Sequence, residues 1–326
     1  MNLDVKEERF NRILTLEDGR RVSFAEAGDP HGMPVFMLYG LGCSRYFVLY
    51  YDEVGKDLGL RLICPDRPGR GYSDHCPDRR FETYADDLLH LADHLGLYYF
   101  GLWGYSAGGA HALACARDKR IAKRLIGRLV VVACWAPTDC PGVKPLHRLA
   151  SSLPRGVLGA VASLLPASDL SNYALSSLRL GKADADQSDI DAETIRLGMI
   201  QQATRQGTKG FRDEVVMCCG TTGNFGFKYE EIDYPTRIYH GRCDKVVPLK
   251  TARYVANHLP DVKYFEIDQI DHQTIIARSL VEGTLMHLIE DITEDLQLVL
   301  PRIIRAKHNT VEMLLASPSP QPVDVK

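Results

Sequence analysis

A serine with a glycine two positions away on each side is the part of this sequence best suited to chemistry. Residues 101–109 read Gly-Leu-Trp-Gly-Tyr-Ser-Ala-Gly-Gly, which places Ser106 in the pattern G-x-S-x-G with Gly104 and Gly108. A strand-like run precedes the pattern, and a helix-like run of small residues follows from Ala107 to Arg117. Such a turn strains the backbone of the serine, so the residues two positions away must be very small. The pattern predicts an exposed, nucleophilic Ser106 hydroxyl at a helix start that faces developing negative charge.

The elements around this turn predict a mostly parallel central sheet flanked by helices. Short apolar runs alternate with amphipathic segments, as in α/β proteins. The expected strands are 12–16 and 22–27, which form a hairpin, then 35–39, 60–64, 98–103, 125–134, 236–240 and 262–267. The expected helices are 84–95, 107–117 and 251–259, with further helices from Thr274 onward.

The alternation of strands and helices stops in the middle of the chain. Between Pro137 and about Asp233 there are helical pieces and turns but no convincing strand. The sequence therefore predicts a core in two parts, residues 1–136 and 234–316, that carries a helical insertion at 137–233. Residues 317–326, rich in serine and proline, are expected to be a disordered tail.

Three motifs in this order resemble those of the α/β-hydrolase family. The serine pattern resembles the nucleophile elbow of that family, with Tyr105 at its variable position before the serine. Residues 65–73 are similar to its D-x-x-G-x-G-x-S loop, and residues 240–248 resemble its H-G-x-x-D-x-x-V-P acid loop. The resemblance extends over nearly the whole chain. It implies the α/β-hydrolase fold, with residues 137–233 in the place of the variable lid, or cap.

The resemblance also implies a Ser-His-Asp triad. A serine hydroxyl needs a base to take its proton, and the base needs an orienting carboxylate. The family order of nucleophile, acid and histidine assigns these roles to Asp244 and His272. Asp244 follows an expected strand, at the edge where α/β sheets build their sites; the alternative is a cap for the helix near Leu249. Asp271 replaces the usual glycine before the histidine and brings an extra carboxylate.

Two backbone N–H groups are expected to form the oxyanion hole. One is that of Ala107, after the nucleophile, and the resemblance assigns the other to Leu41. The family usually has His-Gly before this position, whereas this chain has Tyr39-Gly40, so the packing behind the loop must differ. Among the other histidines, we expect a structural role for His240 and packing or surface roles for His111 and His287.

These residues predict a serine hydrolase that cleaves an ester or thioester of a small molecule through an acyl-enzyme, with no metal or organic cofactor. Triad-based C–C hydrolysis, acyl transfer and lyase or cyclase chemistry remain alternatives, as does a non-catalytic ligand-binding protein on the same fold. Apolar residues of the insertion form lid core or line a pocket for an apolar acyl or polyketide-like group: Leu146, Leu149, Leu153, Val157, Leu158, Val161, Leu164 and Leu165.

A dinucleotide-binding site is a competing interpretation of residues 35–66. A strand leads into Gly40-x-Gly42, and Asp66 ends the next strand. However, Arg45 stands where the third glycine would allow helix and strand to pack closely. An oxyanion loop explains the same glycines.

Composition argues against several other classes of protein. The 326 residues are 45% hydrophobic and 25% charged, which is typical of a globular protein. The net charge is −3 with dispersed basic residues, so nucleic-acid binding is not expected. No apolar run is long enough for an expected transmembrane segment, and the charged N-terminus is not expected to act as a secretory signal. Nine cysteines without a C-x-x-C pair predict reduced, mostly buried thiols in the cytoplasm. Cys218-Cys219 lacks partners at metal-ligand spacing.

Overall fold

The computed structural model describes residues 4–77, 79–145, 189–219 and 225–315, and a few short pieces between 148 and 160. Within these residues the chain forms one eight-stranded sheet in the order β1-β2-β4-β3-β5-β6-β7-β8. The β1–β2 and β2–β4 pairs are antiparallel and the remaining pairs are parallel, which confirms the expected mostly parallel sheet. The strands are β1 Arg12–Thr15, β2 Arg21–Gly28, β3 Met33–Leu38, β4 Leu60–Pro65, β5 Gly101–Tyr105, β6 Leu129–Val132, β7 Thr236–Gly241 and β8 Val262–Ile267.

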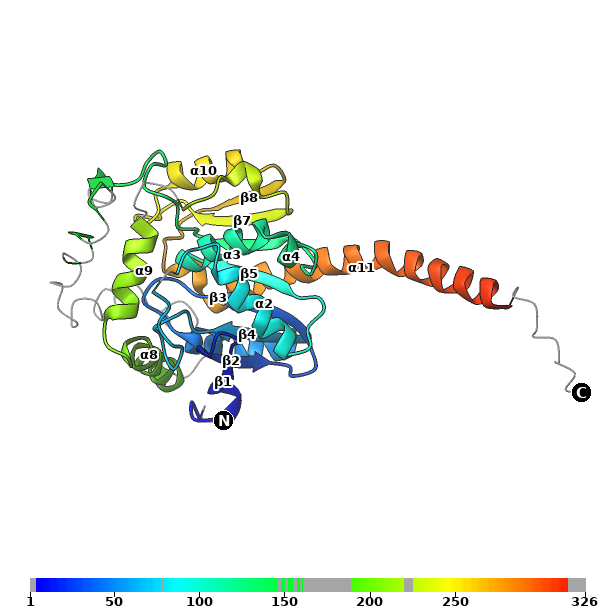
Figure 1. Cartoon of the computed structure of the whole chain (residues 1–326). Coiled ribbons are helices and arrows are strands. Elements are labelled where there is room, and N and C mark those ends of the chain that lie inside the picture. The colour runs from blue at the N-terminus through cyan, green and yellow to red at the C-terminus, as the bar shows by residue number, and fades with distance from the viewer. Residues whose placement is uncertain are drawn as a thin grey trace, which may run out of the picture.

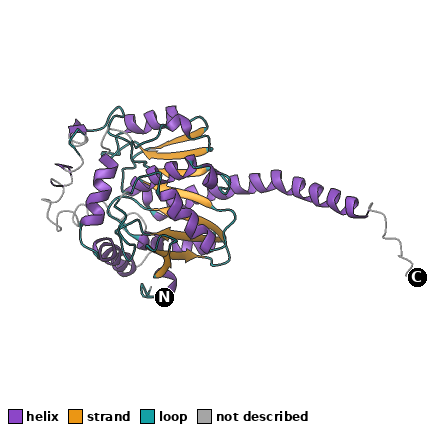
Figure 2. Cartoon of the chain, viewed as in Figure 1, coloured by secondary structure: helices purple, strands orange, loops and turns teal. Residues whose placement is uncertain are grey.

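Helices cover both faces of the sheet (Figure 2). Successive strand residues point to opposite faces, so Phe36 and Leu38 of β3 pack in one apolar layer while Val35 and Met37 pack in the other. The first layer includes α2 Tyr84–His94, α3 Ala107–Arg117, α4 Lys119–Ala122 and α10 Leu249–His258. The second includes η2 Arg45–Tyr51, α1 Asp52–Asp57 and the start of α11 Arg278–Leu315.

Two expected strands begin too early in the sequence prediction. The run at 98–103 was expected to be paired throughout, but β5 starts only at Gly101, and Tyr98 is 83% exposed. Tyr98 and Tyr99 lie in a bend before the strand, and Phe100 forms only an isolated bridge to Leu125. The expected strand at 125–134 is shortened to β6 because Gly127 and Ala133, with φ of +71° and +45°, turn the chain at both ends.

Two helices lie at the edge where the parallel strands end. They are α8 Asp189–Thr204 and α9 Lys209–Cys219, both within the segment expected to be an insertion. Ser44, after β3, donates a hydrogen bond to the carbonyl of Met199 in α8 (3.0 Å). Trp135, after β6, donates its indole N–H to the carbonyl of Cys218 in α9 (3.0 Å). Figure 1 shows α8 and α9 at one end of the sheet and α11 leaving the body on the other side.

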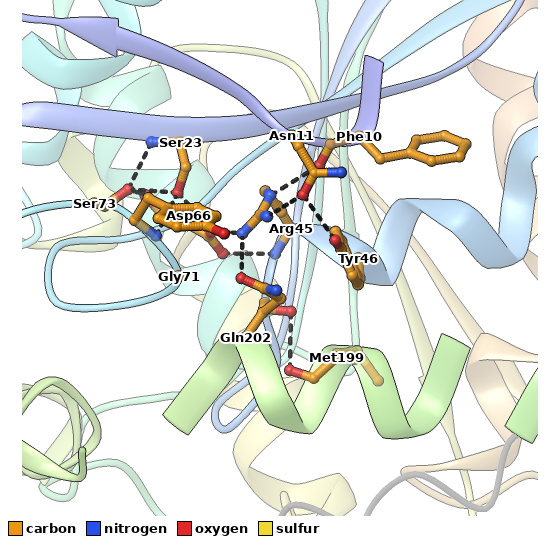
Figure 3. Close-up of polar contacts among 12 residues, drawn as sticks. Phe10, Asn11, Ser23, Arg45, Tyr46, Asp66, Gly71, Ser73, Met199 and Gln202 are labelled. Carbon is orange, nitrogen blue, oxygen red and sulfur yellow. Dashed lines mark hydrogen bonds and ion pairs between the residues drawn. The ribbon is translucent and has the colours of Figure 1, made fainter. Parts of the chain in front are cut away.

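A buried ion pair attaches α8 to the core (Figure 3). Arg45 Nη1 donates to Asp66 Oδ2 (2.7 Å) and to Gln202 Oε1 of α8 (3.0 Å). The same guanidinium donates to the carbonyl of Phe10 (2.9 Å) and to Asn11 Oδ1 (2.7 Å). Four segments that are distant in sequence therefore meet at one fully buried arginine.

The apolar residues expected on the insertion differ in their surroundings. Leu158 is buried with Val216 and Cys219 of α9, whereas Leu149 and Val157 are 64% and 47% exposed. Leu146, Val161, Leu164 and Leu165 lie outside the described residues, as does the tail at 317–326. The boundaries of the insertion stay a prediction. In the described part of the chain, no helix has both the length and the apolar character needed to cross a bilayer.

Candidate active site

The structure brings together three residues that follow three different strands. Ser106 follows β5, Asp244 follows β7, and His272 follows β8. His272 Nδ1 lies 2.7 Å from Asp244 Oδ2, and His272 Nε2 lies 3.0 Å from Ser106 Oγ. Because a carboxylate only accepts hydrogen bonds, Nδ1 carries the proton and Nε2 of the neutral ring accepts from the serine hydroxyl. The arrangement can remove a proton from Ser106.

The backbone of Ser106 is strained and is held by the last residue of β6 and by the segment that follows it. Its φ of +53° lies in the region that favours glycine. The Ser106 N–H donates to the carbonyl of Val132 (2.9 Å), and the Ser106 carbonyl accepts from the N–H of Trp135 (3.0 Å). A Cβ on Gly104 would lie 2.6 Å from the carbonyl oxygen of Gly108, so the small residues are a steric requirement.

The Ser106 side chain is less accessible than the sequence predicted. The residue is 5% exposed and His272 is 3% exposed. A Cβ added to Gly40 would lie 3.2 Å from Ser106 Cβ, so the loop after β3 packs directly against the serine. Ser106 is therefore buried, whereas its hydroxyl was expected to be open to solvent.

Asp244 is oriented by its own loop. Its Oδ1 accepts hydrogen bonds from the N–H groups of Val246 and Val247 (both 2.8 Å), which leaves Oδ2 for His272. The N-cap of α10 is Pro248, so the alternative role of Asp244 as a helix cap is not found. His240 donates from Nε2 to the Val247 carbonyl (3.0 Å), and burial lowers its pKa, in keeping with the expected structural role.

The loop that carries His272 is fixed by two neighbours. The Tyr105 hydroxyl donates to the His272 carbonyl (2.8 Å), a role that the sequence pattern gave no means of predicting. Asp271 accepts from the N–H of Gln273 (3.0 Å) and from the N–H and hydroxyl of Thr274 (2.8 and 2.9 Å). Burial alone would raise the pKa of Asp271, but these hydrogen bonds outweigh it and lower the pKa. The extra carboxylate therefore closes the turn.

The two residues expected to form an oxyanion hole, Ala107 and Leu41, adjoin Ser106 and Gly40 in the chain. Ala107 is the first residue of α3, where the N–H has no acceptor within the helix. Leu41 follows Gly40 in the loop that packs against the serine. Neither N–H donates a hydrogen bond to any residue that the structure describes. Both are available to a ligand oxygen.

Tyr39 and Arg67 together provide the packing behind this loop. The Tyr39 hydroxyl accepts from the Arg67 N–H (2.9 Å), and the Arg67 guanidinium stacks 4.0 Å from the centre of the Tyr39 ring. Arg67 also donates to the Tyr39 carbonyl (2.6 Å) and the Gly40 carbonyl (3.0 Å). Arg67 was not singled out from the sequence, because its partners lie far from it along the chain.

The comparisons with known proteins bear on the family to which this fold belongs. Residues 33–278 match the sequence model of the alpha/beta hydrolase fold. The chain belongs to this family.

Relatives of known name align with most of the chain. A non-heme chloroperoxidase of Streptomyces lividans is 25% identical over 261 residues, which cover 75% of this chain and 88% of the relative. A 2-hydroxy-6-oxononadienedioate/2-hydroxy-6-oxononatrienedioate hydrolase of Pseudomonas putida is 23% identical over 83% of this chain and 93% of its own length. Among solved structures, an esterase from Exiguobacterium antarcticum superposes with a TM-score of 0.68 and 18% identity over 86% of this chain and 99% of its own.

Two other histidines, which compete with His272 by residue type, make their hydrogen bonds elsewhere. His111 lies in α3 and donates to the Ala107 carbonyl (2.9 Å). Burial, with a contribution from nearby Arg67, lowers the pKa of His111 to about 3, so its imidazole is neutral at physiological pH. His287 pairs with the Tyr239 hydroxyl (2.8 Å). Both fit the expected packing roles.

The competing dinucleotide and metal interpretations find no support in the described residues. Asp66 is buried, and its carboxylate is occupied by Arg45 and Ser23 (Figure 3), so it is not free to bind a ribose. Cys218 and Cys219 are buried free thiols. The described part of the chain holds no group of three histidine, cysteine or acidic residues that could bind a metal ion.

Proposed function

We propose that this α/β hydrolase is a serine hydrolase that cleaves an ester or thioester through an acyl-enzyme. The observation that carries the proposal is the continuous hydrogen-bond chain from Ser106 through His272 to Asp244. Such a chain turns a weak nucleophile into a reactive one, because the base is already in place and in the required tautomer.

The mechanism has two halves. His272 Nε2 takes the Ser106 proton as the oxygen attacks the carbonyl carbon, and Asp244 stabilises the imidazolium. The N–H groups of Leu41 and Ala107 donate to the oxyanion. His272 then gives its proton to the leaving alcohol or thiol, and an acyl-enzyme forms. Water, activated by the same imidazole, releases the acid and restores Ser106.

The substrate is proposed to be a small molecule with an apolar acyl or polyketide-like part. Residues 137–233 are proposed as its lid, because α8 and α9 contact the loops that follow β3 and β6, next to Ser106. The burial of Leu158 against α9 supports an apolar interior for this segment. The free state of the nine cysteines is consistent with a reducing compartment such as the cytoplasm.

Labelling with a fluorophosphonate tests the proposal. The wild-type protein should be labelled at Ser106 and should hydrolyse p-nitrophenyl esters or acyl thioesters. Ser106→Ala should abolish labelling and lower kcat by at least about 10⁴-fold. Ser279→Ala, which removes an exposed serine hydroxyl outside the proposed lid, is the matched control and should change neither. Full turnover by Ser106→Ala would refute the assignment. An unlabelled wild-type protein without turnover would favour a ligand-binding role.

Hydrolysis of a C–C bond is the second candidate, and the relatives favour it specifically. Two hydrolases named for 2-hydroxy-6-oxo dienedioates, from Pseudomonas putida and Cupriavidus pinatubonensis, match 83% and 82% of this chain. The same three side chains would serve, with a carbanion equivalent as the leaving group. Turnover of β-diketones at a higher kcat/KM than that of esters, abolished by Ser106→Ala, would select this candidate.

A further inference from the structure

Arg67 connects the loop after β3 to α9. Its Nη1 donates to the Tyr39 carbonyl and its Nη2 to the Gly40 carbonyl, at 2.6 and 3.0 Å. The same Nη2 lies 2.5 Å from Glu214 Oε1 of α9. The two side chains are 1% and 0% exposed. One buried guanidinium thus holds the backbone of the loop on one side and a helix of the proposed lid on the other.

The Gly40 carbonyl belongs to the same peptide unit as the Leu41 N–H. The peptide is planar and trans, so its C=O and N–H point in opposite directions. Arg67 holds the C=O end, with help from the N–H of Cys43 at 3.4 Å. The Leu41 N–H therefore faces away from Arg67, while Gly40 packs against Ser106. Hydrogen bonding at the carbonyl also polarises the unit and strengthens its N–H as a donor.

Glu214 keeps Arg67 in this position. Burial alone would raise the pKa of Glu214, but Arg67, Arg70 and Arg79 outweigh it and lower the pKa to about 2. The carboxylate is therefore ionised at physiological pH, and it fixes a guanidinium that would otherwise lack a buried counter-ion. Tyr39 supports the same arrangement from the other side through its ring.

We propose that Arg67, held by Glu214, is a positioning residue that aims the Leu41 N–H at the oxyanion. The position of α9 against the core then determines how strongly this N–H stabilises the oxyanion. The inference rests on the proposed function. It adds that α9 acts on the chemical step through Arg67, whereas substrate binding in the ground state is unaffected.

Arg70 offers a matched control in the same buried cluster. It lies 3.0 Å from Glu214 Oε2 and is 1% exposed, like Arg67. Its other hydrogen bond goes to the Ala203 carbonyl of α8 (3.0 Å) and not to the loop after β3. A variant of Arg70 therefore disturbs the same carboxylate without releasing the Gly40 carbonyl.

The experiment compares Arg67→Lys, Arg67→Met, Glu214→Gln and Arg70→Met in the full chain. The readouts are kcat and KM for the best p-nitrophenyl ester, and inhibition by a trifluoromethyl ketone, whose serine adduct places an oxyanion in the hole. Arg67→Met should lower kcat by about 10- to 100-fold and weaken the inhibitor in proportion, with KM changed less than about threefold. Arg67→Lys and Glu214→Gln should show smaller losses of the same kind. Arg70→Met should change kcat and inhibition less than about threefold.

Thermal melting separates this role from a structural one. A structural role predicts that Arg67→Met and Arg70→Met lose kcat equally at equal losses of melting temperature, and that result would overturn the inference. If Arg67→Met does not fold, Arg67→Lys and Glu214→Gln test the inference in its place, because both keep a polar group in the cluster. Unchanged kcat and inhibition in these two variants would overturn it as well. Failure of the wild type to label at Ser106 would instead reject the proposed function.

Discussion

The turn that carries Ser106 and the helices α8 and α9 meet at the same edge of the sheet but are held by different forces. The turn is fixed by steric fit: small residues let α3 approach β3, and backbone hydrogen bonds from β6 hold the serine. The two helices are held by buried charges, through Arg45 with Gln202 and through Arg67 with Glu214. Steric fit tolerates almost no added atom, whereas a buried ion pair can be replaced as a pair but fails when only one partner loses its charge.

The largest effect is expected from crowding the turn. A Cβ at Gly108 would collide with the carbonyl of Leu38, which is backbone and cannot move aside. Gly108→Ala should therefore prevent folding or lower the free energy of unfolding by more than about 4 kcal/mol in urea denaturation. Gly283→Ala in α11 is the control, because nothing lies within 4 Å of its added Cβ. It should leave stability unchanged or raise it by up to about 1 kcal/mol. A well-folded Gly108→Ala protein would show that the backbone can shift to accommodate the added Cβ, which contradicts the steric argument.

The second largest effect is expected from removing the buried charge of Arg45, which contacts α8. Arg45→Met leaves Asp66 buried without its counter-ion and should lower the free energy of unfolding by about 3–5 kcal/mol. Adding Asp66→Asn should recover part of the loss. Arg117→Met, which breaks an exposed pair with Glu231, should cost less than about 1 kcal/mol. Equal losses in Arg45→Met and Arg117→Met would remove the contrast between the two regions.

The two regions should also respond to acid in different pH windows. Folding lowers the pKa of His111 on α3 from 6.5 to about 3, so the unfolded chain binds this proton first. Stability is then lost as the pH falls from about 6.5 to about 3. For Glu214 on α9 the pKa falls from 4.5 to about 2, so its contribution is lost between about pH 4.5 and 2.

Denaturant titrations over pH check both windows. His111→Gln should flatten the dependence of the free energy of unfolding on pH between about 6.5 and 4.5, where Glu214 does not yet contribute. Glu214→Gln should flatten it only below about pH 4.5. A His111→Gln profile that matches the wild type would contradict the assignment of the upper window.

The smallest effect concerns one hydrogen bond whose acceptor is neutral. Gln202→Ala removes the acceptor in α8 of the charged Arg45 Nη1 and should cost about 1.5–3 kcal/mol. Its neighbour Gln201 is exposed on the same helix, so Gln201→Ala should cost almost nothing. A comparison of the two by thermal melting measures how much α8 depends on the buried contact.

The turn region was predictable from sequence because its information is local. Ser106, Gly104 and Gly108 stand within five positions, and the helix Ala107–Arg117 was expected with the ends that α3 has. The positions of Asp244 and His272 came from motifs beside expected strands. The charged region was not predictable in the same way: Arg67 and Glu214 are far apart in the sequence, and nothing near either residue indicates its partner. The burial of Ser106 also depends on a distant loop.

The three residues of the candidate site follow β5, β7 and β8, and β8 is an edge strand of the sheet. The imidazole can reach the serine only after that last strand has docked, so chemical reactivity at Ser106 should appear late in refolding. The fluorophosphonate that identifies the nucleophile can therefore time this step. If it is added at successive times after dilution from urea, the extent of labelling at Ser106 reports when the final strand has joined the sheet.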